Sequence, residues 1–242
     1  QVSRRAKENV WQFQEVQEFS SKSTSLNQLA ALFTTAKYSN LIFQEGNAIL
    51  DIGGGKTNLL LDKANENNAT AYIFDPYNIV DTRLSNQEVV DIVKNGGVNV
   101  VTIANVLNVV QEESARAQIL KRADNALADG GTIFISIHKG SKADQQKGSR
   151  KTGKDQFQNY KRAKDYIKEI RKVLPNYDIQ LDPSNEVLTL KRRPQVVTQN
   201  GTLIRRANGI VGKKVGNDLY LHKSYLNQYP EYQDLVKEAK SK

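Results

Sequence analysis

The sequence of 242 residues contains no cysteine, and this absence excludes several kinds of chemistry. Disulfides, thiolate metal sites and a cysteine nucleophile all need the missing residue. Histidine is scarce as well, with two in the chain, and no spacing of histidine with aspartate or glutamate suggests a metal site. We therefore expect neither a disulfide nor a bound metal.

Long apolar runs are also missing. No stretch approaches the roughly 18 apolar residues that a membrane span needs, and residues 1–9 have no apolar core of the signal-peptide type. We therefore expect a cytoplasmic protein with no membrane partner. A chain of 242 residues can bury one full α/β core and still carry extensions at its ends.

Acidic residues are outnumbered, because 26 Asp and Glu stand against 35 Lys and Arg, which gives a net charge of +9. Such an excess favours a polyanionic partner, although solvated lysines can also serve solubility alone. The cations gather in a glycine-punctuated stretch at residues 139–160 and in an extension that starts near residue 191. Both interpretations of the charge stay open.

The most informative stretch covers residues 47–75. A short apolar strand is predicted at residues 48–51, and the glycines at 53–55 then predict a tight turn into a helix that starts near residue 58. Glycine lets backbone N–H groups approach a ligand closely at the start of a helix. A second strand at residues 70–74 ends in Asp75, and an acid there can accept hydrogen bonds from both hydroxyls of a ribose. The sequence therefore predicts a ligand that contains a nucleoside.

The glycine spacing separates the known nucleotide-binding turns. A phosphate loop needs its first glycine at position 50, which is leucine, and a dinucleotide fingerprint needs a third glycine at position 58, which is asparagine. Both therefore fit poorly. The pattern that remains is acid-x-Gly-x-Gly at Asp51, Gly53 and Gly55, with Asp75 downstream. A glycine turn without a ligand is the plain structural alternative.

Helical and strand patterns alternate along the rest of the chain. Helices are predicted at residues 10–19, 26–33, 86–94, 112–128 and 161–174, and strands at 98–104, 132–137, 177–181 and 186–190. Residues 105–108, Asn-Val-Leu-Asn, follow the strand at 98–104. Because few residues separate the strands at 70–74 and 98–104, a strand between them is expected to be abbreviated or absent. Residues 139–160 are predicted to form a long basic loop, and a charged helix is predicted from about residue 230.

In this order the motifs resemble the class I S-adenosylmethionine-dependent methyltransferases over about residues 47–138. The resemblance implies a Rossmann-like α/β sheet, mostly parallel with a terminal antiparallel hairpin, plus N-terminal helices and a basic C-terminal extension. It divides the chain into a helical extension at 1–45, a methyltransferase-like domain at 46–194 and a basic extension at 195–242. The chain departs from the family at Thr57, where a third glycine is usual. No adenine-contacting segment is recognised.

A finer similarity links the chain to a group of methyltransferase-like proteins associated with DNA modification and mobile elements. It rests on residues 105–108, on residues 156–160, Gln-Phe-Gln-Asn-Tyr, and on the stretch from Gly212 to Ser224. This similarity implies nucleic acid as the partner, DNA more than RNA.

The resemblance implies S-adenosylmethionine as the cofactor and assigns roles to single residues. Asp51 would orient the methionine amino group, Asp75 would hold the ribose, and Asn105 would lie near the transferred methyl. The candidate cofactor-binding residues are Asp51, Gly53, Gly54, Gly55, Lys56, Asp75, Pro76, Tyr77 and Asn105.

The candidate catalytic residues are Asn105, Asn108 and His138. Asn108 could accept a hydrogen bond from a target amino group, or it could cap the helix that follows. His138 could act as a general base near neutral pH, or it could simply be solvated. Methylation at the C5 atom of a pyrimidine is excluded, because it proceeds through a covalent thiol adduct.

Cations and aromatic residues supply the candidate nucleic-acid contacts. Cations could follow a phosphate backbone and aromatic rings could stack on bases, and a solvated charged face is the alternative. The candidates are Lys147, Arg150, Lys151, Lys154, Phe157, Tyr160, Arg205, Arg206, Lys213 and Lys214. We interpret the protein as a methyltransferase that acts on nucleic acid. The alternatives are an inactive module of the same fold that binds nucleic acid or a protein, and a methyltransferase of small molecules.

Overall fold

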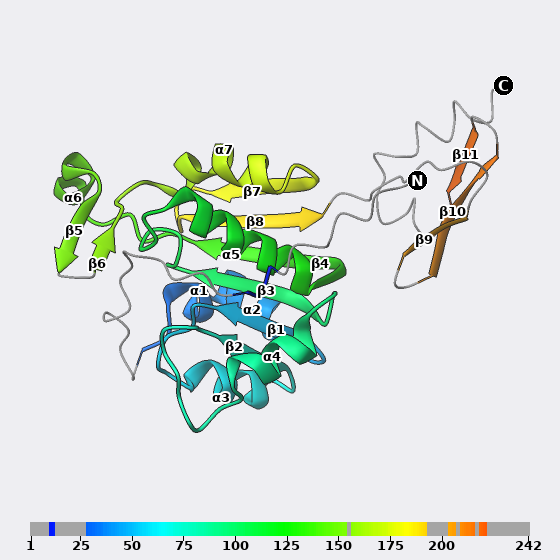
Figure 1. Cartoon of the computed structure of the whole chain (residues 1–242), viewed down its shortest axis with the longest axis horizontal. Coiled ribbons are helices and arrows are strands. Elements are labelled where there is room, and N and C mark those ends of the chain that lie inside the picture. Colours follow the sequence, from blue (N-terminus) through cyan, green and yellow to red (C-terminus); the bar gives the residue numbers. More distant parts are fainter. Residues whose placement is uncertain are drawn as a thin grey trace. The chain divides into compact units, whose positions relative to one another are not determined.

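A computed structural model of the chain is drawn in Figure 1 and describes residues 10–12, 28–153 and 156–192. It also describes the course of the backbone at 203–206, 209–215 and 218–221. The chain divides into two compact units, Gln1–Arg193 and Pro194–Lys242. Most of the predicted helix at residues 10–19, and all of the one from about residue 230, lie outside the described residues.

A six-stranded sheet in the order β2-β1-β3-β4-β8-β7 forms the centre of the first unit. Strands β2, β1, β3 and β4 run parallel, β8 pairs antiparallel with β4, and β7 pairs antiparallel with β8. The prediction of a mostly parallel sheet with a terminal antiparallel hairpin is therefore confirmed. The strands are β1 (Ala48–Ile52), β2 (Thr70–Phe74), β3 (Val98–Ala104), β4 (Leu127–Ser136), β7 (Tyr177–Asp182) and β8 (Val187–Arg192).

Helices cover both faces of this sheet, as the almost continuous apolar runs of the parallel strands require. One hydrophobic cluster joins the sheet to α1 (Ala31–Thr34), α2 (Ala36–Ile42) and α3 (Leu59–Glu66). The other joins it to α4 (Asn86–Val93), α5 (Glu113–Ala126) and α7 (Ala163–Val173). Among the helices described here, none is long and apolar enough to cross a membrane.

The interval between β2 and β3 contains no strand. Residues 75–97, all of which the structure describes, form a loop, helix α4 and a short turn. Strand β2 is therefore an edge strand of the sheet. This agrees with the expectation that the strand between these two would be abbreviated or absent.

Residues 139–160 are more ordered than the predicted loop. They contain α6 (Lys142–Lys147) and an antiparallel pair, β5 (Arg150–Gly153) with β6 (Gln156–Gln158). Helix α6 starts at a capping box, in which the Ser141 Oγ accepts a hydrogen bond from the Asp144 N–H at 3.2 Å and the Asp144 carboxylate accepts one from the Ser141 N–H at 3.1 Å. This segment projects past the carboxyl ends of the parallel strands (Figure 1).

The second unit contains a three-stranded antiparallel sheet in the order β11-β10-β9. Its strands are β9 (Leu203–Arg206), β10 (Gly209–Val215) and β11 (Asp218–Leu221). The sequence predicted a basic extension here, and no strand was recognised in it.

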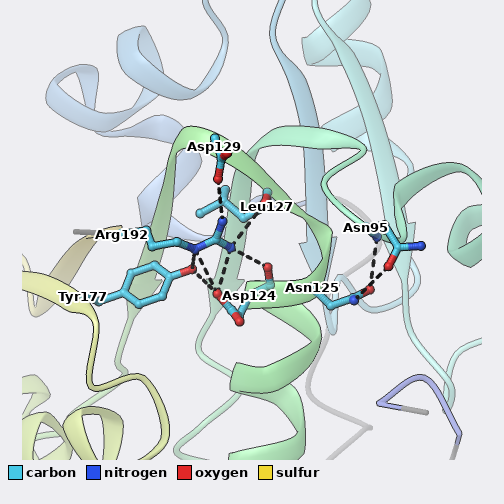
Figure 2. A network of polar contacts seen from close by, with 7 residues as sticks. All are labelled: Asn95, Asp124, Asn125, Leu127, Asp129, Tyr177 and Arg192. Atoms are coloured by element: carbon cyan, nitrogen blue, oxygen red, sulfur yellow. Dashed lines mark hydrogen bonds and ion pairs between the residues drawn. The ribbon is translucent and has the colours of Figure 1, made fainter. Parts of the chain in front are cut away.

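A partly buried polar network ties the terminal hairpin to helix α5 (Figure 2). The Arg192 guanidinium donates to Asp124 Oδ1 at 2.8 Å and to Asp129 Oδ1 at 3.2 Å. The Tyr177 hydroxyl donates to the same Asp124 oxygen at 2.5 Å. Burial, followed by the Asp124 carboxylate, raises the pKa of Tyr177. This network attaches the end of β8, the last strand of the first unit, to α5 and to the start of β4.

Candidate functional site

Strand β1 ends in a glycine turn that leads into α3. Gly53 and Gly55 have φ angles of 82° and 69°, a left-handed conformation that favours glycine. The Gly53 N–H donates to the Phe74 carbonyl at 2.8 Å, which ties the turn to the end of β2. A Cβ atom at Gly53 would lie 2.6 Å from a methyl group of Val106, which follows β3. The turn is therefore packed between the ends of the two strands that flank β1.

Asp75 follows β2, and its carboxylate faces this turn. Its Oδ2 accepts hydrogen bonds from the Gly55 N–H at 2.8 Å and from Asn78 Nδ2 at 3.0 Å. Its Oδ1 accepts from the N–H groups of Tyr77 at 3.0 Å and Asn78 at 3.1 Å. The turn and the acid thus lie together, as the sequence suggested. Protein donors already occupy both carboxylate oxygens, so a ligand at Asp75 would have to displace some of these hydrogen bonds.

Arg83 closes the same arrangement from the loop after Asp75. Its Nη2 donates to the carbonyls of Gly55 at 2.9 Å and Asn78 at 2.6 Å. Its Nη1 is buried and has no hydrogen-bond partner among the described residues. Burial lowers the pKa of Arg83, while Asp75 and then Asp51 oppose this shift. Sequence reasoning missed Arg83, since a lone cation in a polar loop carries no recognisable spacing.

Asp51 lies on β1 beneath the turn and is 3% exposed. Its Oδ1 accepts a hydrogen bond from Thr102 Oγ1 at 2.6 Å. Burial raises the pKa of Asp51 to about 7; the bond from Thr102 opposes this shift, the Asp75 charge adds to it, and Arg83 opposes it. A Cβ atom at position 54 would lie 2.7 Å from Asp51 Oδ2, so Gly54 leaves room for this carboxyl. The group therefore changes protonation near neutral pH.

Asn105 and Asn108 follow β3 on the other side of β1. Asn105 has a φ of 59°, its N–H donates to the Ser136 carbonyl at 3.0 Å, and its Oδ1 accepts from Ser136 Oγ at 3.4 Å. Asn108 is 1% exposed, and its Oδ1 has no hydrogen-bond partner within the described part of the chain. It does not cap the next helix, because the N-cap of α5 is Glu112. The capping alternative for Asn108 is therefore wrong.

The other predicted cofactor and catalytic residues surround this centre more loosely. Lys56 is exposed, and Pro76 and Tyr77 are half-buried in the turn after β2. His138 follows the end of β4 and is exposed. The carboxyl ends of the parallel strands thus bring together Asp51, the glycine turn, Asp75 and Asn105, with His138 at the end of the next strand along.

Two of the predicted nucleic-acid contacts need correction. Phe157 and Tyr160 are 7% and 9% exposed, and a side chain at Gly140 would collide with the Tyr160 ring. Neither ring is available for stacking on a base, because both complete the packing of this segment. Lys147 and Lys151 are exposed. Lys154 and the side chains of Arg150, Arg205, Arg206, Lys213 and Lys214 lie outside the described residues.

No protein-family model and no curated protein matches the sequence. Solved structures with a similar fold exist at low sequence identity. A 1,6-didemethyltoxoflavin-N1-methyltransferase of Burkholderia thailandensis, solved with bound 1,6-didemethyltoxoflavin and S-adenosylhomocysteine, is 14% identical, with a TM-score of 0.48 over 67% of this chain and 75% of the other. A SAM-dependent methyltransferase of Methanosarcina mazei is 12% identical, with a TM-score of 0.37 over 63% and 95%.

The sheet order itself assigns the fold. Four parallel strands in the order β2-β1-β3-β4, followed by the antiparallel pair β8-β7, form the class I methyltransferase arrangement without its third strand. The glycine turn lies at the carboxyl end of β1, where the strand order reverses. Ligands of open α/β sheets bind outside the carboxyl ends of the strands at such a point.

Proposed function

We propose that the protein is an S-adenosylmethionine-dependent methyltransferase that acts on nucleic acid, on DNA more than on RNA. At the point where the strand order reverses, the Gly55 N–H of the glycine turn donates a hydrogen bond to Asp75 Oδ2 at 2.8 Å. This contact is the observation that carries the proposal. In this fold a nucleoside-containing cofactor is expected between those two features. Asn105 and Val106 border the same point from the end of β3.

The residues present suit the two polar ends of this cofactor. Asp51 is a buried carboxyl that can accept a hydrogen bond or an ion pair from the methionine amino group, and its pKa of about 7 makes the ionised form accessible at neutral pH. Asp75 is the acceptor for the ribose hydroxyls. A ribose bound there has to displace the hydrogen bonds that Asp75 now accepts from Asn78. The cofactor itself supplies an activated methyl group, so the protein contributes position and alignment.

The acceptor side is supported by two residues. Asn108 Oδ1 is a buried acceptor without a hydrogen-bond partner among the described residues, and it suits an amino group of a base. His138 is exposed at the same edge and suits a general base. Nucleic acid as the partner is supported by the net charge of +9 and by the exposed cations of the segment that projects at this edge.

A second candidate function is a binding module that has kept the fold without methyl transfer. Three observations favour it: the fully occupied carboxylate of Asp75, the Arg83 guanidinium held against Gly55, and the absence of a strand between β2 and β3. The first two limit the access of an adenosyl group to the turn, and the third removes a segment that could contact it. The two candidates differ at cofactor binding, so that step decides between them.

Calorimetry with S-adenosylmethionine and S-adenosylhomocysteine tests the proposal. We expect binding by the wild type, and at least tenfold weaker binding by Asp75→Ala, since about 1.4 kcal/mol of lost hydrogen bonding corresponds to that factor. Asp81→Ala is the matched control, because Asp81 is an exposed acid in the same loop. Thermal unfolding of each variant establishes that it is folded.

The outcomes separate the candidates. No heat at millimolar cofactor, with Asp75→Ala indistinguishable from the wild type, would disprove the proposed enzyme and favour the binding module. Binding of the cofactor without transfer of a labelled methyl group to DNA or RNA would favour a methyltransferase of small molecules. ATP affinity that is lost in Lys56→Ala would instead favour a phosphate loop.

A further inference from the structure

The positive charge of the protein is concentrated in two parts of the sequence. Residues 139–173 hold twelve Lys and Arg against four Asp and Glu, a net charge of +8, and residues 191–242 hold eleven against four, a net charge of +7. Residues 58–97, which include α3, β2 and α4, hold three Lys and Arg against six Asp and Glu. A charge that served solubility alone would need no such separation.

Within the basic stretch, helix α7 and the residues just before it present a cationic row, which we define as Lys161, Lys164, Lys168 and Arg171. Lys164, Lys168 and Arg171 follow one another at intervals of three or four, so they lie along one side of the helix. Lys161 precedes the helix by two residues, and all four side chains are exposed. The opposite side is buried through Ala163, Tyr166 and Ile170. Within the described part of the chain, none of the four makes an ion pair. Lys172 differs, because its Nζ lies 3.0 Å from Glu113 Oε1.

The helix that carries the cationic row is firmly held at its start. The buried carboxylate of Glu186 accepts hydrogen bonds from the Ala163 N–H at 2.7 Å and from Arg162 Nε at 2.8 Å, and it pairs with Lys139 at 3.2 Å. Further along, Glu169 forms an ion pair with Arg116 of α5 at 2.7 Å. The row is therefore a fixed feature of the surface and not a flexible tail.

The row begins at the edge of the sheet where the candidate site lies. Helix α7 starts on the side to which the parallel strands point, beside the segment formed by α6, β5 and β6 (Figure 1). The exposed Lys147 and Lys151 belong to that segment. Positive side chains thus extend from this edge along the whole of α7.

We propose that the cationic row of α7 binds the phosphate backbone of the nucleic-acid acceptor and leads it to the carboxyl edge of the sheet. The identity of the partner rests on the proposed function. From Lys164 to Arg171, seven residue steps at 1.5 Å span about 10 Å. One strand of a duplex has a phosphate about every 3.4 Å along its axis, so this part of the row matches about three phosphates. A membrane surface fits less well, because the apolar side of α7 is buried in the core and cannot insert into lipid.

Fluorescence anisotropy of a labelled DNA duplex, titrated with the full chain at several salt concentrations, tests this proposal. The variant carries Lys161→Gln, Lys164→Gln and Lys168→Gln together. Each lost phosphate contact reduces the slope of log K against log salt by about 0.9, so we expect a reduction of two to three, and binding at least about tenfold weaker at 0.1 M salt. Thermal unfolding establishes that the variant is folded.

Two single variants serve as controls. Lys172→Gln removes a cation of the same helix that Glu113 already pairs, and Lys94→Gln removes one that Asp91 pairs at 2.6 Å on the acidic part of the chain. Both should change the slope by clearly less than the ~0.9 that one lost phosphate contact produces.

Three results would overturn the proposal: a triple variant with an unchanged slope, controls that lose as much affinity as the triple variant, or a wild type that binds phosphatidylserine vesicles but no nucleic acid. The assay needs no cofactor. A protein that fails to bind S-adenosylmethionine yet shows the expected loss of slope would therefore disprove the proposed enzyme and leave the binding row standing.

Discussion

Replacing Asp51 by asparagine should change how the stability of the protein depends on pH. Asp51 is buried under the glycine turn, and its pKa is raised from 3.8 to about 7, chiefly by burial. The folded state therefore holds this proton more tightly than the unfolded state does. In the wild type this contribution to stability is complete below pH 4 and is lost as the pH rises to 7. Asparagine has no proton to lose, and it can still accept the hydrogen bond from Thr102.

The magnitude follows from the size of the shift. A change of about three pKa units at 1.36 kcal/mol each corresponds to about 4 kcal/mol over the full titration. Between pH 5 and pH 8 the expected part is about 3 kcal/mol. The free energy of unfolding of Asp51→Asn, minus that of the wild type, should rise by this amount across the interval. The new amide changes the absolute stability as well, but that offset does not vary with pH.

Urea unfolding followed by circular dichroism at pH 5, 6, 7 and 8 measures this difference. Asp62→Asn is the matched control, because Asp62 is an exposed carboxylate on α3. A difference between Asp51→Asn and the wild type that stays constant over the whole interval would refute the reasoning. It would mean that Asp51 is ionised in the folded protein and that water or a cation reaches it.

Two further predictions concern the fold. Arg192→Gln should lower the free energy of unfolding by about 2 kcal/mol in urea titrations, because the hydrogen bonds to Asp124 and Asp129 are charge-assisted. An equal loss in Lys191→Gln, whose side chain is exposed, would contradict this explanation. Gly97→Ala should lower the free energy of unfolding by about 3 kcal/mol, since the new Cβ would lie 2.6 Å from the Val93 Cα. Gly130→Ala should lower it by about 1 kcal/mol, because only the φ of 80° at this position opposes alanine. Similar midpoints for the two glycine variants would rule out the steric explanation.

Local patterns predicted the framework of the first unit closely. Strands β2 and β3 have the bounds expected from the sequence, and α4 and α7 lie within one or two residues of theirs. These elements are long apolar or periodic runs with glycine or polar residues at their ends, so each one determines its own structure. The short interval between β2 and β3 likewise predicted the missing strand, because the chain there has no second apolar run.

Short elements inside a polar segment were not predictable in the same way. Residues 139–160 hold glycines and cations without apolar periodicity, so α6 and the β5–β6 pair were expected to be loop. The same lack of pattern misled the interpretation of Phe157 and Tyr160 as exposed rings. Whether an isolated aromatic residue in such a segment is buried depends on what packs against it, and Gly140 is that partner for Tyr160.

The candidate site likewise has one part that the sequence predicted and one part that only the folded structure shows. The sequence predicted the glycine turn and the acid at the end of the next strand, since both depend on local backbone geometry. The contacts that occupy Asp75, the approach of Arg83 to Gly55 and the neutral-range pKa of Asp51 arise only when distant segments pack together. Burial and hydrogen bonding act through space, so these properties exist only in the folded chain.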